Sequence, residues 1–589
     1  MGACQSCQIG CSICGCPPSH RLVKGHAVQP RVWRLPPTSS PLNGFAFELQ
    51  EFEDLQSRAS VGMALGGGGV RSAAQMNGIF KVLLQHDLLK RVRYVSSCSG
   101  ASWFLAPFAF LPEDFSMETF LGGPPLGANA LTLPVLRDLK EGSWLKAAGS
   151  AKGNSELLCA VCADDCCLES CQIDACCTCC PQLTLRAWNQ VMATNYLEPF
   201  NLGSQRSVMA LPVGTDNCAR ATQSMAGSSV TVNPLRTGGP YPIITAARPD
   251  PTAPSESWLP VEFTPLACGT PMLDENARGG VVGGGVVESF GYNSLGPGGS
   301  HTGRTAVQDG DEVGVIPDFF VPLALAAGTS AAGYTLVMKN NTIAVELAGG
   351  PTLQLWSPAD TTSDNNKLSA LYDSGSSDTS AILALLRRGV RKIIAPFSNL
   401  SALTDDITSL TGNSWLPGLF GRNIVAPTSE ASTDLLNRNC KVFESSELDN
   451  MFNGLRAKQK AGGPPVFQQT LEVFANKWCG VVGGWRVTIV WVFPDLTDRF
   501  RDNLPPDTKL KLEQPPTVGP FTECVYKIFP IAKTKNIAFS EKDIDSTFPY
   551  DSTNWGYYSP ELCHLLAEAM ANNLQEGMGV AQLKAFFDD

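Results

Sequence analysis

The sequence predicts an α/β fold, and two stretches near the start of the chain support this prediction. An apolar run, Val61 to Leu65, meets four glycines, Gly66 to Gly69, and then a helical pattern. A second short strand, Val92 to Ser96, leads into the small residues Ser97 to Ser102 and another helix. Strand, glycine loop, helix, strand, tight turn and helix in this order define a βαβα unit with one special turn after each strand.

Both turns contain residues suited to acyl transfer. Glycines accept positive φ and let backbone N–H groups approach another atom closely. At the start of a helix these groups favour negative charge. Ser99 lies between small neighbours, where a tight strand-to-helix turn can expose its hydroxyl group. A loop that can stabilise an oxyanion, next to an exposed serine, is the arrangement that acyl-transfer enzymes use.

The glycine loop has three alternative interpretations, which are weaker or less specific. A loop that only turns tightly would contain the same glycines. A P-loop is excluded because no Lys-Ser/Thr pair closes the motif. A dinucleotide-binding fold is disfavoured because the second strand ends in Ser96-Ser97-Cys98, where a ribose-binding Asp or Glu would be expected.

Composition narrows the class of protein. The chain has 589 residues, of which 43% are hydrophobic and 17% charged, as in a globular protein with a substantial core. Its net charge of −11 argues against bulk nucleic-acid binding. No uninterrupted apolar run is long enough to span a membrane. The nearest candidate, Phe319 to Met338, contains Pro322 and Gly328 and is expected to lie in the core.

The N-terminal residues predict a membrane anchor. They fit the N-myristoylation pattern, with Gly2 exposed after removal of Met1 and Ser6 at the required position. Cys4 and Cys7 follow as palmitoylation candidates, and Cys11, Cys14 and Cys16 are further ones. One myristoyl chain binds membranes only marginally, so a second acyl chain matters. The alternatives are a disordered tail and a metal-binding tract, although the cysteine pairs are too close together for an ordinary zinc ribbon.

Charge supports the anchor. Four basic residues surround Trp33, and no acidic residue precedes Glu48. Basic residues near an anionic membrane surface each contribute about 1 kcal/mol of attraction. We therefore expect residues 1–57 to form an acylated, cysteine-rich and basic tail on the cytoplasmic face of a membrane, with residues 58–589 as one catalytic domain.

Two insertions interrupt that domain. The first, Cys159 to Cys180, is a second cysteine cluster, and the second is a Gly-rich loop over 294–314. A disulfide scaffold is not expected in a chain without a secretory signal. Metal binding by thiolates, acylation and a loosely folded thiol-rich insertion remain open for Cys159 to Cys180. The glycine-rich run Gly279 to Gly285 is expected to form a lid or loop.

Ser99 needs a base, and none of the five histidines has the setting of one. They lie in the tail, near the end of the first long helix, in the Gly-rich loop and in a C-terminal helix: His20, His26, His86, His301 and His564. A carboxylate is the next candidate. Asp373, in the sequence LYDSG, lies at a strand-to-helix turn. A partly buried Asp there could act as a base, whereas local evidence alone favours an Asx-turn or helix cap.

These motifs together resemble the cytosolic phospholipase A2 (group IV, patatin-like) family. The specific ones are GGGGVRS, YVSSCSGASWF and LYDSG followed by LLRRGVRKIIAPF, in the order that the family has them. PIITAA, VEFTP, LTLRAW and FPYDSTNWGYYSPELCHLLAEAM look like further landmarks. The resemblance covers the chain from about residue 58 onward. It implies a central mixed sheet flanked by helices, with a lid or insertion region.

The resemblance also implies roles for single residues. Ser99 matches the nucleophile and Asp373 the base of a Ser-Asp dyad. Gly67, Gly68 and Gly69 match the oxyanion loop, and Arg71 matches an arginine that binds the phosphate head group or steadies the site. The chain departs from the family pattern at two small residues of the elbow: Ser97 stands for a glycine and Ala101 for a serine.

The expected function is that of a phospholipase A2-type lipid acyl hydrolase without a cofactor or metal ion. A lysophospholipase or transacylase would use the same dyad. A non-catalytic membrane scaffold would keep the fold without the reaction. The phospholipid surface is the expected partner, as substrate and as anchor. Few residues precede the first strand, which leaves no room for a calcium-dependent lipid-binding domain, so we expect calcium-independent attachment.

Overall fold

A computed structural model describes most of the chain from residue 30 onward. The described ranges are 30–37, 44–150, 193–202, 207–228, 230–250, 258–275, 279–291, 352–359, 368–412, 415–422, 440–515, 542–550 and 558–588. Gly2, Cys4, Cys7, the cluster Cys159 to Cys180 and the loop 294–314 lie outside these ranges.

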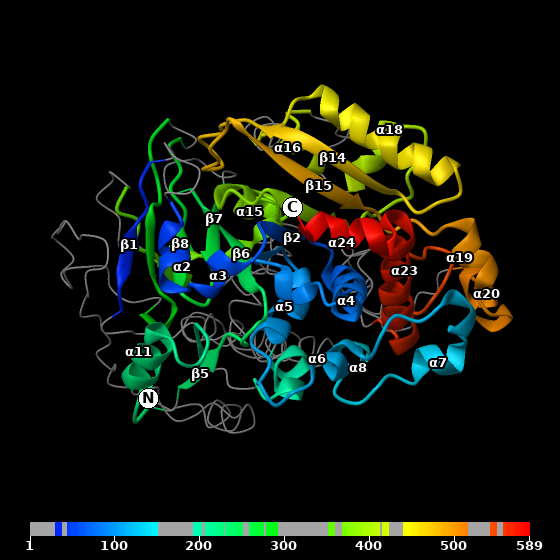
Figure 1. Cartoon of the computed structure of the whole chain (residues 1–589), viewed down its shortest axis with the longest axis horizontal. Coiled ribbons are helices and arrows are strands. Elements are labelled where there is room, and N and C mark those ends of the chain that lie inside the picture. Colours follow the sequence, from blue (N-terminus) through cyan, green and yellow to red (C-terminus); the bar gives the residue numbers. More distant parts are fainter. Residues whose placement is uncertain are drawn as a thin grey trace, which may run out of the picture.

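A large mixed sheet forms the centre of the protein (Figure 1). Within the described ranges it contains eleven strands, in the order β1-β9-β8-β7-β6-β3-β2-β13-β15-β14, with β12 paired to β6. The strands are β1 (Val32–Arg34), β2 (Val61–Leu65), β3 (Tyr94–Ser97), β6 (Tyr241–Pro249), β7 (Trp258–Phe263), β8 (Ala267–Thr270), β9 (Gly285–Glu288), β12 (Tyr372–Asp373), β13 (Lys392–Pro396), β14 (Val466–Val473) and β15 (Trp485–Val492). The predicted α/β fold with a central mixed sheet is confirmed.

The middle of the sheet is parallel and both sides are antiparallel. β6, β3, β2, β13 and β15 run parallel, and β7, β8, β9, β1 and β14 add antiparallel neighbours. All residues of β2 and β3 are buried, as expected for parallel strands covered on both faces. Two two-stranded sheets lie apart from it: β4 (Ser207–Ala210) with β5 (Thr231–Pro234), and β10 (Thr352–Gln354) with β11 (Leu368–Ala370).

Helices cover the sheet. They are α2 (Ala46–Glu51), α3 (Asp54–Ser57), α4 (Gly69–Gln85), α5 (Ala101–Ala109), α6 (Met117–Leu121), α7 (Leu133–Arg137), α8 (Trp144–Gly149), α11 (Asp216–Met225), α15 (Leu383–Arg387), α16 (Trp415–Leu419), α18 (Ser446–Lys460), α19 (Asp498–Asn503), α20 (Pro506–Leu512), α23 (Pro560–Met578) and α24 (Val580–Asp588). Side chains alternate between the faces of a strand. On β3, Ser96 bonds Ala381 just before α15, and Ser97 bonds Ser102 of α5 at 2.8 Å. Helices α15 and α5 therefore lie on opposite faces.

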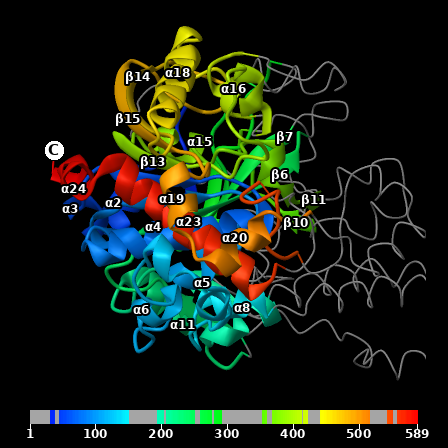
Figure 2. The same cartoon turned by 90° about the vertical axis from the view of Figure 1, so that its right-hand side faces the viewer.

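The helices α4 and α23 lie side by side in both views (Figures 1 and 2). Their backbones meet at Gly78, where an added Cβ would lie 1.9 Å from the carbonyl oxygen of Ala567. Near this crossing, the buried side chains of Lys81 and Glu568 form an ion pair of 2.6 Å. This close packing fixes the helix that begins with the glycine loop.

Part of the N-terminal segment that the sequence assigns to the tail is built into the fold. β1 pairs with β9 at one edge of the sheet. The rings of Trp33 and Phe47 stack at 4.8 Å, and both side chains join the main core. Burial of these aromatic side chains stabilises the segment, so the folded part begins well before residue 58.

Two features are absent from the described residues. None of their helices has the length and apolarity needed to cross a bilayer. No group of three or more His, Cys, Asp or Glu side chains in these ranges is arranged to hold a metal ion.

Candidate active site

Ser99 lies in the tight turn between β3 and α5. Its φ is +53°, a value that is uncommon for a residue with a side chain and costs of order 1–3 kcal/mol. The preceding Cys98 is completely buried, whereas Ser99 is partly exposed. The turn thus exposes the hydroxyl group of Ser99 at the end of a buried strand, as the sequence predicts for a strand-to-helix elbow.

The glycine loop meets this turn because β2 and β3 are parallel neighbours. Leu65 at the end of β2 pairs with Ser97 at the end of β3, so the segments that follow them leave the same edge of the sheet. An added Cβ on Gly67 would lie 3.2 Å from Cβ of Ser99, and one on Gly100 would lie 2.3 Å from the carbonyl oxygen of Gly69. Glycine is therefore required at position 100, and a side chain at position 67 would fit only if its neighbours shifted.

Backbone N–H groups of the two turns are candidate donors to an oxyanion. Gly68 is the N-cap of α4, Gly69 begins that helix, and Gly100 is the N-cap of α5. The first N–H groups of a helix have no acceptor within it. By contrast, the N–H group of Gly67 donates to the carbonyl oxygen of Thr379 at 2.9 Å. The N–H groups of Gly68, Gly69 and Gly100 are thus better placed to bind an oxyanion. The N–H group of Gly67 instead links the glycine loop to the segment that contains Thr379.

Asp373 reaches Ser99 from a distant part of the chain. The two-residue strand β12 pairs antiparallel with β6, with Asp373 opposite Ala246. The Ser99 hydroxyl group donates to Oδ2 of Asp373 at 2.8 Å. The other oxygen, Oδ1, accepts from the N–H group of Gly375 at 2.7 Å. The local Asx-type turn and the contact with Ser99 therefore exist together, each using one carboxylate oxygen.

The loop after Asp373 is fixed from within. The buried carboxylate of Asp378 accepts hydrogen bonds from Ser380 N at 2.9 Å, Ser380 Oγ at 2.5 Å and Leu383 N at 2.9 Å. Burial raises the pKa of Asp378 despite these bonds. The next residue, Thr379, accepts the Gly67 bond described above. The segment that carries the carboxylate is thereby attached to the glycine loop.

Cys98 does not compete with Ser99 as a nucleophile. Burial raises the pKa of its thiol well above the ordinary value, and the nearby charge of Asp373 raises it further. Thiolate, and not thiol, is the reactive form of cysteine. Ser99 is therefore the reactive candidate of this turn.

Arg71 lies in the first turn of α4 and is 1% exposed. Its guanidinium group donates to Ser398 Oγ at 2.7 Å and to Ser398 O at 3.0 Å. Ser398 in turn lies under the glycine loop, since a Cβ on Gly68 would be 2.6 Å from its Oγ. In this arrangement Arg71 supports the glycine loop indirectly, by holding Ser398 against Gly68.

The two histidines of the described ranges lie in other surroundings. His86 is the C-cap residue of α4. His564 lies in α23, with Nδ1 3.3 Å from the carbonyl oxygen of Leu136 and Nε2 3.5 Å from Glu568. The ring of His564 is thus held by contacts of both its nitrogen atoms, whereas His86 takes part in the helix cap through its backbone.

Sequence reasoning did not identify three residues that build this site: Gly100, Thr379 and Ser398. A glycine directly after an elbow serine is a usable signal for Gly100. Thr379 contacts the glycine loop through its backbone carbonyl group, and Ser398 contacts Arg71 through both its hydroxyl and its carbonyl group. No local sequence pattern indicates contacts of this kind.

Comparison with known protein families and with curated proteins finds no match. Among solved structures the chain is similar to human GIVD cytosolic phospholipase A2, with 13% identity and a TM-score of 0.44 over 91% of this chain and 64% of that chain. The same protein in complex with methyl gamma-linolenyl fluorophosphonate gives 14% identity and a TM-score of 0.40, over 91% and 61%. The chain thus spans less than two thirds of the length of these proteins.

Proposed function

We propose that the chain is a lipid acyl hydrolase of the phospholipase A2 type with a Ser-Asp dyad. The observation that carries the proposal is the hydrogen bond of 2.8 Å from Ser99 Oγ to Asp373 Oδ2. It joins a hydroxyl group on a strained turn to a carboxylate, beside a loop whose backbone donors lie at the start of a helix. The choice of a lipid substrate rests on the ordered motifs that resemble the cytosolic phospholipase A2 family.

In the proposed reaction Asp373 accepts the proton of Ser99 while Oγ attacks the ester carbonyl carbon. The N–H groups of Gly68, Gly69 and Gly100 hold the negative charge that develops on the carbonyl oxygen. Collapse of the tetrahedral intermediate breaks the ester bond, and the proton on Asp373 goes to the departing alcohol. A water molecule then gives a proton to Asp373 and attacks the acyl-serine. The bond between the acyl group and Ser99 Oγ breaks, Asp373 returns the proton to Oγ, and the fatty acid is released.

A lysophospholipase or transacylase would use the same residues. The first would take a glycerophospholipid with one acyl chain, and the second would replace water by an alcohol in the final step. The panel that separates them contains a diacyl phospholipid, a monoacyl phospholipid and an added acceptor alcohol.

We further propose that the N-terminal tail attaches the enzyme to the cytoplasmic face of a membrane. Gly2, Cys4 and Cys7 would carry the acyl chains, and Arg21 and Lys24 would add attraction to anionic lipid. Arg31, by contrast, pairs with Glu51 and Glu288 in the fold. The substrate surface and the anchor would then be the same bilayer, without a need for calcium.

A fluorophosphonate probe tests the central proposal. Such a reagent modifies an activated serine, so we expect it to label wild-type protein at Ser99, identified by peptide mass spectrometry, and to leave Ser99→Ala unlabelled. A wild-type chain that stays unlabelled while folded is the outcome expected of a non-catalytic scaffold, and would overturn the assignment.

A further inference from the structure

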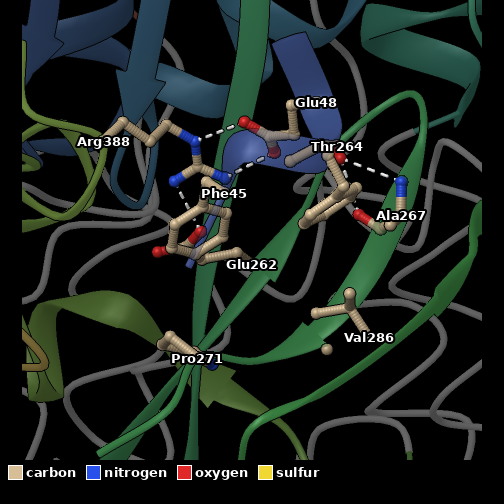
Figure 3. A pocket seen from close by; sticks show the side chains of 10 residues that line it. Phe45, Glu48, Glu262, Thr264, Ala267, Pro271, Val286 and Arg388 are labelled. Carbon is tan, nitrogen blue, oxygen red and sulfur yellow. Dashed lines mark hydrogen bonds and ion pairs between the residues drawn. The ribbon is translucent and has the colours of Figure 1, made fainter. Parts of the chain in front are cut away.

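Four charged side chains are buried together where the N-terminal segment meets the sheet. Arg388 donates from Nε and Nη2 to the two oxygens of Glu48, both at 2.8 Å, and from Nη1 to Oε2 of Glu262 at 2.7 Å (Figure 3). Arg387 donates from Nε and Nη2 to the other oxygen of Glu262, at 2.9 and 2.6 Å. Each of the four side chains is at most 4% exposed. Two carboxylates thus balance two guanidinium groups.

The two arginines end the same segment that begins with Asp373. Asp373 at its start pairs with Ala246 of β6, and the next strand, β7, carries Glu262. Arg387 and Arg388 at its end are held by that Glu262. The segment is therefore attached to the sheet at both ends. The attachment at its end consists of buried charges and not of backbone pairing.

Glu48 comes from another part of the chain, on α2 in the N-terminal segment. The ring of Phe45, beside α2, lies 3.9 Å from the guanidinium carbon of Arg388. Next to these groups is a small cavity, lined among others by Phe47, Thr264 and Val286. The centre of a water molecule can move within about 10 Å³ of it. That volume holds roughly one water molecule. The packing of α2 on the sheet is thus incomplete here, and the bidentate Glu48–Arg388 pair supplies a directional link.

The ionisation of the cluster depends on all four members. Burial raises the pKa of Glu48 even though Arg388 opposes this. The pKa of Glu262 is lowered, because the effects of Arg388 and Arg387 outweigh burial. Without Glu48, the two arginines would share the single carboxylate of Glu262, leaving one buried positive charge uncompensated. Such a charge is strongly destabilising for the segment that bears it.

We propose that Glu48 is a positioning residue for Asp373. When residues 44–52 are packed on the sheet, Glu48 binds Arg388. This bond fixes α15 and the loop before it, and the loop in turn keeps Asp373 next to Ser99. Displacement of the segment would free that loop and separate the dyad. The predicted effect on the reactivity of Ser99 rests on the function proposed above. The prediction that α2 and residues 374–388 open together does not.

The first test compares Glu48→Gln with Glu51→Gln in the full chain. Glu51 lies on the same helix and bonds Arg31, so it controls for loss of a carboxylate from α2. We expect Glu48→Gln to slow fluorophosphonate labelling of Ser99 by about 10- to 100-fold, well below its melting temperature, because small misplacements of a catalytic group have effects of this size. Glu51→Gln should stay within about twofold of wild type. Equal rates in the two folded variants would overturn the proposal.

The second test uses the wild-type chain and needs no activity. Hydrogen exchange followed by mass spectrometry at rising denaturant should show that peptides of 44–52 and of 374–388 open together, in one transition below global unfolding. Opening of 44–52 while 374–388 stays protected would overturn the coupling. This measurement decides the question even if Glu48→Gln does not fold. If Ser99 of the wild type did not react with the probe, the proposed function would fail, and the exchange result would still decide the coupling.

Discussion

Gly100 and Gly69 touch backbone to backbone, so closely that a methyl group on Gly100 would lie 2.3 Å from the carbonyl oxygen of Gly69. This contact joins the serine turn to the glycine loop. Each of the two turns therefore depends on the shape of the other, and the candidate oxyanion donors on both sides are set by one packing arrangement.

Replacing Gly100→Ala should damage both stability and reaction. The new methyl group must push the two backbones apart, which costs about 1–3 kcal/mol of folding stability. Displacement of one oxyanion donor lowers the turnover number by about 10²- to 10³-fold. Thermal unfolding and ester hydrolysis measure the two effects. Gly44→Ala is the matched control, because an added Cβ there meets nothing within 4 Å. Unchanged hydrolysis by Gly100→Ala would remove this turn from the oxyanion site.

Loss of either member of the dyad should abolish hydrolysis without unfolding the protein. Ser99→Ala removes the attacking oxygen, and Asp373→Asn removes the base while keeping the bond to Gly375. We expect each to lower the turnover number by at least about 10³-fold, with the double variant no worse than the more impaired single one, since the two act as a unit. Hydrolysis of a fluorescent phospholipid in vesicles provides the assay. Ser150→Ala, at the exposed C-cap position of α8, should keep near wild-type activity.

Substrates with and without phosphate distinguish two roles of Arg71. Arg71→Lys keeps the charge but cannot donate to both Ser398 Oγ and Ser398 O in the same way. If Arg71 supports the glycine loop, hydrolysis of a phospholipid and of a neutral aryl ester should fall by a similar factor, about 10- to 100-fold. Selective loss of phospholipid hydrolysis would instead assign Arg71 to the head group. Arg499→Lys, on an exposed side chain, is the control.

The buried pair between α4 and α23 predicts a pH dependence of stability. Glu568 also accepts a bond from Leu126 N at 2.6 Å, and the positive charge of Lys81 contributes to its lowered pKa despite burial. A lowered carboxyl pKa adds stability above the unfolded value near 4.5, and this contribution is lost as pH falls through the folded value. Glu568→Gln should therefore cost about 3–5 kcal/mol at neutral pH.

Denaturant unfolding at several pH values tests that dependence. The stability gap between wild type and Glu568→Gln should narrow as the pH drops below about 4.5, because the wild-type carboxylate becomes protonated. Glu576→Gln, more exposed on the same helix, should change the free energy of unfolding by no more than about 0.5 kcal/mol. A gap that stays constant down to acid pH would show that the ion pair is not its source.

Membrane attachment should depend on Gly2. Gly2→Ala removes the myristoylation site, and palmitoylation of Cys4 and Cys7 alone is then the remaining anchor. We expect most of this variant to leave the membrane fraction on cell fractionation, whereas Gly10→Ala should stay with it. Full retention of Gly2→Ala would contradict the anchor.

The central unit of the fold could be predicted because its signals are local. Both strands of this unit are runs of neighbouring apolar residues followed by small residues. The structure has β2 and β3 at these two runs. By contrast, the helix that follows the turn at Asp373 begins only at Leu383, since Ala381 has a φ of +59° and the carboxylate of Asp378 accepts from Leu383 N. A turn of this kind leaves little trace in hydrophobic periodicity.

Contacts between distant residues could not be predicted from local patterns, and the Ser99–Asp373 pair was expected only through the family resemblance. Glu48 and Arg388 look separately like surface charges, and only the fold buries them against each other. The same holds for the bond from Gly67 to Thr379, which changes the set of candidate oxyanion donors. The segment around Trp33 looked like a continuation of the basic tail, because the edge strand β9 that receives it lies far along the chain.

The carboxylate of the proposed dyad is carried by β12, whose ladder with β6 has two residue pairs. Ser99, in contrast, follows a strand paired on both sides within the parallel centre of the sheet. The two groups proposed to react are thus held by backbone structures of very different stability. A motion that drew Asp373 away would break few backbone bonds and leave the sheet intact, so the protein could lose its chemistry and regain it without passing through an unfolded state.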